Sequence, residues 1–230
     1  MNPNPTDLEI LYEDNHLIII NKKPGDISQG DKTGDESLID KVKKYIKHKY
    51  NKPGNVFSGL VHRLDRPTGG VIMFAKTSKA LSRLNKMLRE GKIKKTYWAV
   101  TEGIPAKNED TLIHYLKKNP KTNKTTVYPR KTEGAKKAVL HYKVIKKGER
   151  YALLEIDLET GRHHQIRAQL SKIGHPVKGD LKYGAKHSLE GGGIMLHARK
   201  ISFKHPVRDK IMEITAPPEP KHWDIIEKFK

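Results

Sequence analysis

The sequence predicts an α+β fold built on a mixed, mainly antiparallel central sheet that helices and loops flank. Segments with the two-residue alternation or the short apolar runs of strands outnumber segments with helical spacing. Most consecutive strand candidates are also close enough along the chain to form hairpins. No internal repeat and no shift in composition marks a linker, so we expect one domain over residues 1–230.

The first third of the chain is expected to hold two strands, a helix and a third strand. LEILYEDNHLIII at residues 8–20 indicates two strands around the turn Glu13-Asp14-Asn15, and Pro24-Gly25 ends the second. After a loop, apolar residues recur at helical spacing, at Leu38, Ile39, Val42, Tyr45 and Ile46. VIMFA at residues 71–75 is an unbroken apolar run that predicts a buried strand.

The middle of the chain predicts a capped helix followed by an alternating strand. TSKALSRLNKMLREG at residues 77–91 offers Thr77 or Ser78 as the N-cap and Gly91 as the stop. In KKTYWAVTEG, Lys95, Tyr97 and Ala99 share one strand face. Thr96, Trp98 and Val100 share the other, and Trp98 is expected in the core.

The last third adds four strands and one short helix. Strands are expected at residues 139–145 and 151–158. HHQIRAQLSKIG predicts a helix that turns Ile166, Leu170 and Ile173 inward and ends at Gly174. Residues 194–216 predict a strand pair joined by a proline-containing turn at residues 205–208.

The chain is strongly basic, with a formal net charge of +20 and a pI of about 9.9. Residues 117–150 hold twelve Lys and Arg against Glu133 and Glu149, a net +10 that is half of the total. A basic excess of this size favours a polyanionic partner, most often nucleic acid, although a lysine-rich proteome gives the same composition. The hydrophobic content of 35% is enough for a folded core.

Several classes of site are excluded or disfavoured. The chain has no cysteine, which excludes disulfides and thiolate–zinc sites. Its twelve histidines show no HExxH spacing, and GDISQGDK lacks the Lys-Ser/Thr ending of a phosphate loop. Residues 1–15 lack the basic head and apolar core of a secretory signal, and the run at residues 17–20 is too short to cross a bilayer. We therefore expect a cytoplasmic protein with no metal and no membrane partner.

HRLDRPTGG at residues 62–70 places Asp65 between Arg63 and Arg66 in a stretch that closes with glycines. If the chain is extended there, the side chains of Arg63 and Asp65 point to the same face. A carboxylate beside fixed cations stays ionised at neutral pH, as a nucleophile requires. From this segment alone, a carboxylate that caps the following turn is the simpler interpretation.

Two further segments carry candidate residues, each with an ordinary alternative. In LETGRHHQIRAQL, a helix start at Thr160-Gly161 puts His163 and Arg167 one turn apart, where Arg167 can pair with a distant carboxylate. An ordinary basic surface helix has the same pattern. In KKTYWAV, Tyr97 can stack on a base from a basic strand face, or it can be a simple core or surface tyrosine.

Together these segments resemble the RluA-type family of RNA pseudouridine synthases. HRLDRPTGG resembles the signature HRLDxxTSG, KKTYWAV the strand K-x-Y-x-A, and TGRHHQIR the segment TGRTHQIR. INKKPGD, GHPVKGDLKYG and LHARKISFKHP resemble an early NKP-x-G loop and two later stretches of the family. The similarity runs in order from about residue 8 to residue 216, so chance does not explain it.

The resemblance implies a pseudouridine synthase catalytic fold with an active-site cleft, in an isomerase that modifies uridines of structured ribosomal or transfer RNA. Asp65 would be the catalytic carboxylate, Arg167 its ion-pair partner, and Tyr97 the ring that stacks on the uracil and serves in proton transfer. Arg63 would help to flip the uridine. The resemblance also implies that the reaction needs no cofactor. The residues of this chain at the substrate-binding positions of the family would be His62, Arg63, Arg162 and Leu196. We expect a monomer without the separate N-terminal RNA-binding domain that some members carry.

The sequence departs from the family pattern at three places. Gly69 stands where the family usually has Ser, His163 where it has Thr, and Gln29 where a His is common. None of them is the expected nucleophile, so we expect activity, with differences in loop geometry and RNA contacts.

Two other functions compete with this interpretation. A catalytically inactive RNA-binding or ribosome-assembly protein on the same fold shares the basic charge and Tyr97, but has no use for an Asp–Arg pair. An aspartate-dependent glycosidase needs two carboxylates around the scissile bond, and HRLDRPTGG, KKTYWAV and TGRHHQIR hold only Asp65.

Overall fold

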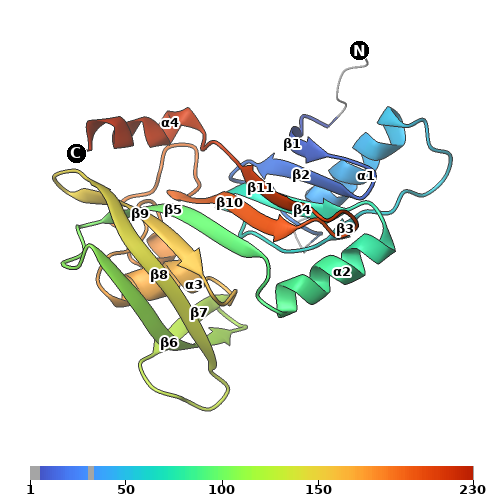
Figure 1. Ribbon diagram of the computed structural model, residues 1–230. Helices are drawn as coiled ribbons and strands as arrows, with labels where there is room; N and C mark the ends of the chain where they lie inside the picture. Colours follow the sequence, from blue (N-terminus) through green and yellow to red (C-terminus); the bar gives the residue numbers. More distant parts are fainter. Residues whose placement is uncertain (1–5, 31–33, 230) are drawn as a thin grey trace. The chain divides into compact units, whose positions relative to one another are not determined.

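The computed structural model describes residues 6–30 and 34–229, and it confirms an α+β fold with largely antiparallel strands (Figure 1). Two compact units divide the chain. Unit 1 comprises residues 1–93 and 198–217, and unit 2 comprises residues 94–197 and 218–230. Residues 1–5 of the N-terminal stretch and residues 31–33 of the loop before the first helix, for which expectations were given above, lie outside the described residues.

Unit 1 has a sheet with the strand order β1–β2–β4–β10, in which β3 pairs with β4 and β11 pairs with β10. The strands are β1 (Glu9–Glu13), β2 (Leu17–Lys22), β3 (Gly59–Leu60), β4 (Gly69–Ala75), β10 (Leu196–Lys204) and β11 (Ile211–Thr215). The first two residues of β10 are counted with unit 2, and unit 1 takes up the strand at Ala198. The expected β1–β2 hairpin is confirmed, because the two strands pair antiparallel. In its turn, Asp14 Oδ1 accepts the backbone N–H groups of His16 and Leu17 at 2.7 and 2.8 Å. The expected pair at the C-terminal end is confirmed as β10 and β11.

Both expected helices of unit 1 form, and α2 has the ends that the sequence predicted (Figure 1). In α1 (Leu38–Lys49), Ser37 Oγ accepts the N–H of Asp40. In α2 (Ser78–Arg89), Thr77 is the N-cap and its hydroxyl accepts the N–H of Ala80 at 3.2 Å. Gly91 follows α2 with a φ of +67°, the left-handed conformation that commonly ends a helix.

One part of the core of unit 1 lies between its sheet and α2. Every residue of β2 is buried, and β4 is buried along its whole length. Ala80 and Leu84 of α2 pack against alternate residues of three strands, which are Leu17, Ile19, Val71, Met73, Ile201 and Phe203. Such interlocking apolar burial is the main source of stability of a sheet-and-helix layer.

Unit 2 has five antiparallel strands in the order β5–β9–β8–β6–β7. These are β5 (Lys94–Glu102), β6 (Glu109–Asn119), β7 (Lys124–Tyr128), β8 (Lys136–Lys147) and β9 (Tyr151–Leu158). Strands β5, β8 and β9 are confirmed. The β6–β7 hairpin was not predicted, and it forms the first part of the basic stretch at residues 117–150.

The remaining elements of unit 2 are α3 (Gln165–Lys172), the 3-10 turns η1 (Leu181–Tyr183) and η2 (Asp224–Lys228), and α4 (Pro220–Trp223). Helix α3 packs against β6 and β7. It begins at Gln165, because His164 is left-handed with a φ of +51°. The predicted helix start at Thr160-Gly161 was therefore wrong, and His163 precedes the helix.

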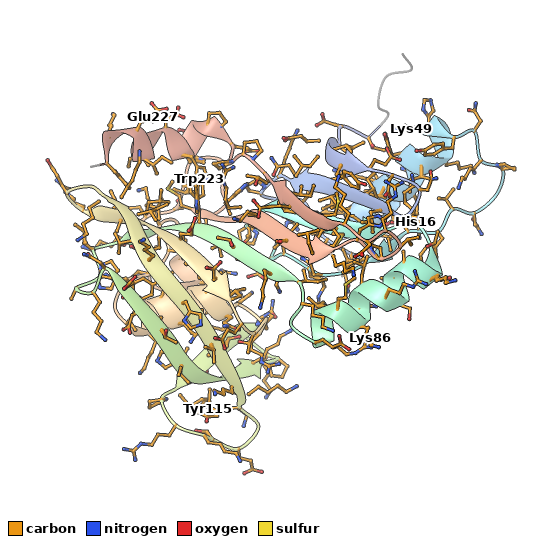
Figure 2. All side chains as sticks on the ribbon, in the orientation of Figure 1. His16, Lys49, Lys86, Tyr115, Trp223 and Glu227 are labelled. Carbon is orange, nitrogen blue, oxygen red and sulfur yellow. The ribbon has the colours of Figure 1, made fainter. Side chains whose placement is uncertain are left out.

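A second apolar cluster lies in unit 2 around Trp223 of α4. Val100, Leu153, Met195 and Phe229 are buried with it. Trp98 is half-buried and packs at the edge of this cluster, with its ring centroid 6.5 Å from that of Trp223. The side chain of Trp223 is labelled in Figure 2. Within the described ranges, no helix is both long and apolar enough to span a membrane.

Candidate active site

Asp65 lies in the loop between β3 and β4, and a buried lysine holds the backbone of this loop. Lys22 at the end of β2 is only 1% exposed, and its ammonium donates to the carbonyl oxygens of Arg66 at 3.0 Å and Thr68 at 2.8 Å. Gly25 also donates its N–H to the carbonyl of Arg66 at 2.8 Å. A charged donor that bonds carbonyl groups inside a protein fixes their orientation strongly. The chain after Asp65 is thereby anchored to the end of β2.

The chain before Asp65 is anchored as well. Ser28 Oγ donates to the carbonyl of Leu64 at 2.9 Å and accepts the N–H of the same residue at 3.3 Å. The carbonyl of Asp65 accepts the N–H of Thr68 at 3.0 Å, which closes a tight turn. Asp65 itself is half-buried. Its backbone is therefore fixed from both sides while part of its side chain stays accessible.

The residues that flank Asp65 differ in exposure. Arg63 and Arg66 are exposed, and Arg66 forms an ion pair with Asp35 at 2.8 Å. His62 is buried. Arg63 thus lies where a substrate can reach it, whereas Arg66 has a partner within unit 1.

The HRLDRPTGG segment closes with two glycines, and the second of them is required for a steric reason. Gly70 has a φ of +112°, and a Cβ atom there would lie 2.3 Å from the carbonyl oxygen of Ala198 in β10. No other residue fits this position without moving the neighbouring strand. Gly69 is the first residue of β4, and nothing in the structure explains why it replaces the usual serine.

In unit 2, one glutamine organises the TGRHHQIR segment. Gln165 Oε1 accepts hydrogen bonds from Thr160 Oγ1 at 2.8 Å and from the N–H of Arg162 at 3.0 Å. Its Nε2 group donates to the carbonyl of Val139 in β8 at 3.0 Å. Arg162 is exposed, and its Nε donates to the carbonyl of Lys137 at 3.0 Å. The turn before α3 is therefore fixed to β8.

Arg167 on α3 forms a buried ion pair that sequence reasoning missed. Its Nε and Nη2 donate to the two carboxylate oxygens of Asp180 at 2.6 and 2.8 Å, and both residues are at most 5% exposed. The guanidinium also lies 5.1 Å from the ring centroid of Tyr183. Bidentate pairing fixes the plane of a guanidinium group, so Asp180 determines how Arg167 is oriented. The signal for it was present in GHPVKGDLKYG, whose aspartate received no role.

Tyr183 connects the same segment to β7. Its hydroxyl accepts the N–H of Thr125 at 2.8 Å and bonds His164 Nδ1 at 2.9 Å. Burial raises the pKa of Tyr183, so this hydroxyl keeps its proton and can donate it to His164. His163 stacks on His164 with ring centroids 3.7 Å apart and bonds Thr125 Oγ1 through Nδ1 at 2.8 Å. The unusual histidine at residue 163 thus has a structural place in this network.

The other expected site residues of unit 2 lie on strands. Tyr97 lies in β5 and is 7% exposed, so it does not lie on an open surface. Leu196 is the first residue of β10 and is 5% exposed. Among the described residues, no group of three or more His, Asp or Glu side chains is placed to hold a metal ion. The expected site residues thus come from both units, with His62, Arg63 and Asp65 in unit 1 and Tyr97, Arg162, Arg167 and Leu196 in unit 2.

Comparison with known proteins gives a consistent family. A model of the RNA pseudouridylate synthase family matches residues 16–172. An uncharacterized RNA pseudouridine synthase of Bacillus subtilis, YhcT, is 35% identical over 221 residues, which cover 94% of this chain and 70% of that protein. Ribosomal large subunit pseudouridine synthase C of Buchnera aphidicola (subspecies Baizongia pistaciae) is 36% identical over 216 residues, which cover 90% of this chain and 66% of that protein.

Solved structures share the fold. Human RNA pseudouridylate synthase domain containing 4 superposes with a TM-score of 0.77, covering 92% of this chain and 88% of its own, at 23% identity. Human RNA pseudouridylate synthase domain containing 1 gives a TM-score of 0.74 over all of this chain and 91% of its own, at 22% identity. At this level of identity the likeness concerns the fold.

Proposed function

This chain belongs to the RNA pseudouridine synthases of the RluA type, and from that premise we propose that Asp65 is its catalytic carboxylate. The enzyme is an isomerase that acts on RNA. In the reaction, the bond between N1 of uracil and C1′ of the ribose breaks and a bond between C5 and C1′ forms. C5 loses its hydrogen as a proton and N1 gains one, so no atom is added or removed overall.

The anchoring of the Asp65 loop is the observation that carries this proposal. Lys22 and Ser28 fix the backbone on the two sides of Asp65, at Arg66 and at Leu64. A reacting group must be held within a fraction of an ångström of its working position and must still be reachable. A carboxylate that only capped a turn would not need two anchors from another segment.

The other proposed roles follow the family pattern. Arg167 pairs with Asp65 in the working enzyme, and the bidentate bond from Asp180 supports this role because it fixes the guanidinium plane. Tyr97 stacks on the uracil and takes part in proton transfer. The reaction requires the base to leave the RNA helix. Arg63 helps to flip the nucleotide, and the remaining proposed contacts to it come from His62, Arg162 and Leu196.

We propose a stem–loop of ribosomal RNA as the substrate, with transfer RNA as the second candidate. The names of relatives from Buchnera and Vibrio, which are ribosomal large subunit pseudouridine synthases, favour the first. The β6–β7 hairpin supplies exposed cations for the phosphate backbone, at Lys117, Lys118, Lys121 and Lys124. Such contacts make binding weaken steeply as salt rises. The enzyme is proposed to work as a monomer in the cytoplasm.

Mapping of pseudouridines in total RNA tests this function. A strain that lacks the gene is complemented with the wild type, with Asp65→Asn, or with Asp209→Asn, which removes an exposed carboxylate at the turn after β10. We expect the wild type and Asp209→Asn to restore the same pseudouridines, and Asp65→Asn to restore none while it still binds RNA. Appreciable turnover by Asp65→Asn would refute its catalytic role. A wild type that modifies no RNA would favour the inactive RNA-binding protein.

A further inference from the structure

Lys95 of β5 is a half-buried cation for which the described part of the chain supplies no hydrogen bond and no ion pair. Loss of hydration lowers the pKa of its ammonium group, and no carboxylate offsets this effect. Lysine is seldom withdrawn from water without a partner, because the uncompensated charge destabilises the folded state. A group kept in this condition is a candidate for binding an anion that comes from outside the chain.

The acidic residues next to β5 lie on the other face of the sheet. In the register of β5 and β9, Thr96 is opposite Asp157 and Trp98 is opposite Glu155. The two carboxylates bond those partners, with Thr96 Oγ1 at 2.6 Å from Asp157 and Trp98 Nε1 at 3.4 Å from Glu155. Side chains alternate along a strand, so Lys95 points to the opposite face. The negative charge of β9 therefore does not neutralise Lys95.

Two neighbours indicate what can reach this ammonium. Its Nζ lies 3.3 Å from the position that a Cβ atom of residue 161 would occupy, and that residue is an exposed glycine. A larger residue there would crowd the ammonium, whereas Gly161 leaves it open to a ligand from solvent. Tyr97 is two residues further along the same face of β5, about 7 Å away.

We propose that Lys95 binds a phosphate group of the RNA strand, adjacent to the uridine whose base contacts Tyr97. This role rests on the function proposed above, in which Tyr97 meets the uracil. In a nucleotide, the phosphate lies a few ångströms from the base. Lys95 and Tyr97 place a cation and an aromatic ring on one face of β5 at a comparable spacing. A single-stranded RNA site combines the same two elements, a cation for the backbone and a ring for the base.

Binding of a labelled oligomer of five uridines, followed by fluorescence anisotropy across a series of salt concentrations, tests the proposal. Lys94 is the matched control, because it is an exposed lysine on the other face of the same strand. We expect Lys95→Gln to weaken binding about tenfold at low salt and to reduce the slope of log affinity against log salt by about 0.7. Lys94→Gln should change affinity less than twofold, and Lys95→Arg should restore most of the loss.

Equal effects of Lys95→Gln and Lys94→Gln would overturn the proposal, and so would a wild type that does not bind the oligomer at low salt. Thermal unfolding separates a binding role from a structural one. Removal of an uncompensated charge should raise the melting temperature by about 2 °C, whereas loss of a structural lysine would lower it. If Lys95→Gln binds normally while the wild type still makes pseudouridine, only the role of Lys95 fails. If the wild type modifies no RNA, the proposed function itself fails.

Discussion

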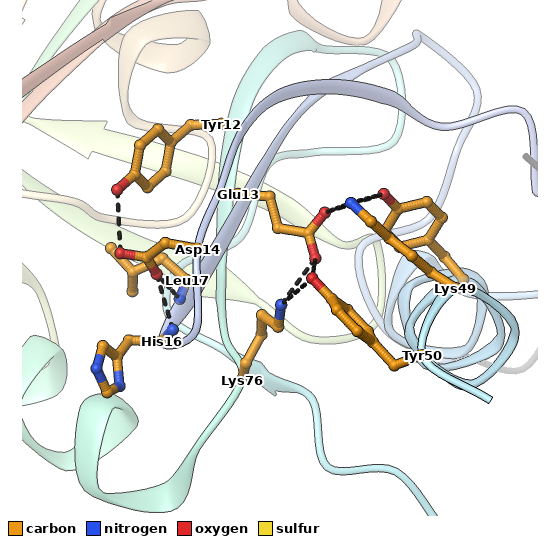
Figure 3. A network of polar contacts seen from close by, with 9 residues as sticks. Tyr12, Glu13, Asp14, His16, Leu17, Lys49, Tyr50 and Lys76 are labelled. Carbon is orange, nitrogen blue, oxygen red and sulfur yellow. Dashed lines mark hydrogen bonds and ion pairs between the residues drawn. The ribbon is translucent and has the colours of Figure 1, made fainter. Parts of the chain in front are cut away.

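Unit 1 and unit 2 each contain a charged side chain that is partly withdrawn from water. In unit 1 hydrogen bonds and ion pairs compensate this charge, whereas in the described part of unit 2 they do not. Glu13 at the end of β1 accepts hydrogen bonds from the ammonium groups of Lys49 and Lys76 and from the hydroxyl of Tyr50 (Figure 3). It also accepts a hydrogen bond from the hydroxyl of Tyr45 at 2.9 Å. Burial opposes its ionisation, but these bonds outweigh burial and lower the pKa of Glu13 to about 2. Lys95 in unit 2 has no such compensation among the described residues.

This difference distinguishes charges that stabilise the fold, such as Glu13, from charges that are available to bind a ligand, as proposed for Lys95. The Glu13 cluster joins β1, α1 and the end of β4, three segments that are distant in sequence, and its donors and acceptor satisfy one another. A satisfied polar cluster contributes to a unique packing. A polar group left unsatisfied at a reachable position costs stability, and such positions gather where proteins bind or react.

The largest effect should come from removing the partner of a compensated buried charge. Asp180→Asn leaves the guanidinium of Arg167 buried without its bidentate carboxylate, and we expect a loss of about 3–5 kcal/mol in the free energy of unfolding. Urea denaturation measures the loss, and Asp209→Asn, which removes an exposed carboxylate, should change the free energy by less than about 0.5 kcal/mol. A change below about 1 kcal/mol in Asp180→Asn would mean that Arg167 is compensated elsewhere.

Lys22 should give the next largest effect and should link stability to activity. Lys22→Met deprives the buried carbonyls of Arg66 and Thr68 of their charged donor, which should cost about 2–3 kcal/mol. Because these carbonyls hold the Asp65 loop, kcat should fall more than the affinity for RNA. Single-turnover assays and filter binding distinguish the two quantities. Lys23→Met removes an exposed lysine at the next position, and an equal loss of kcat in that variant would argue against the anchoring role.

Glu13→Gln should give a smaller and pH-dependent effect. The folded-state pKa of about 2 lies below the ordinary value of 4.5, so the stabilisation is fully present above pH 4.5 and is lost as the pH falls towards 2. We expect the variant to be about 2 kcal/mol less stable at pH 7, after allowance for solvent screening, and nearly equal to the wild type near pH 2. Unfolding curves at several pH values measure this, and a difference that stayed constant with pH would contradict it.

Local sequence signals predicted part of this structure well. The β1–β2 turn at Asp14 and the Thr77 cap of α2 were expected, because side chains close in sequence make the deciding hydrogen bonds. The β6–β7 hairpin was missed. Its lysines and Pro120 suggest a solvated loop, and the burial that marks it as sheet is confined to a few residues such as Leu112 and Thr125.

The site was predicted less completely than the fold. The pair between Arg167 and Asp180 depends on how the chain folds back after α3, and no local pattern encodes that contact. The left-handed residue His164 delays α3 to Gln165, and the hydrogen bond to Tyr183 that accompanies it is also tertiary. The uncompensated state of Lys95 depends on the register between β5 and β9, which places the carboxylates on the other face.

The division of the chain has a consequence for its synthesis. In unit 1, β4 ends at Ala75, but its neighbour β10 enters the unit only at Ala198, after about 120 further residues. At roughly 5–20 residues per second, a ribosome needs on the order of ten seconds to supply them. During that interval the edge of β4 that later pairs with β10 has no partner strand. Most of unit 2 is synthesised in the same interval and can begin to fold. The nascent chain should therefore depend most on chaperones between the synthesis of β4 and the synthesis of β10.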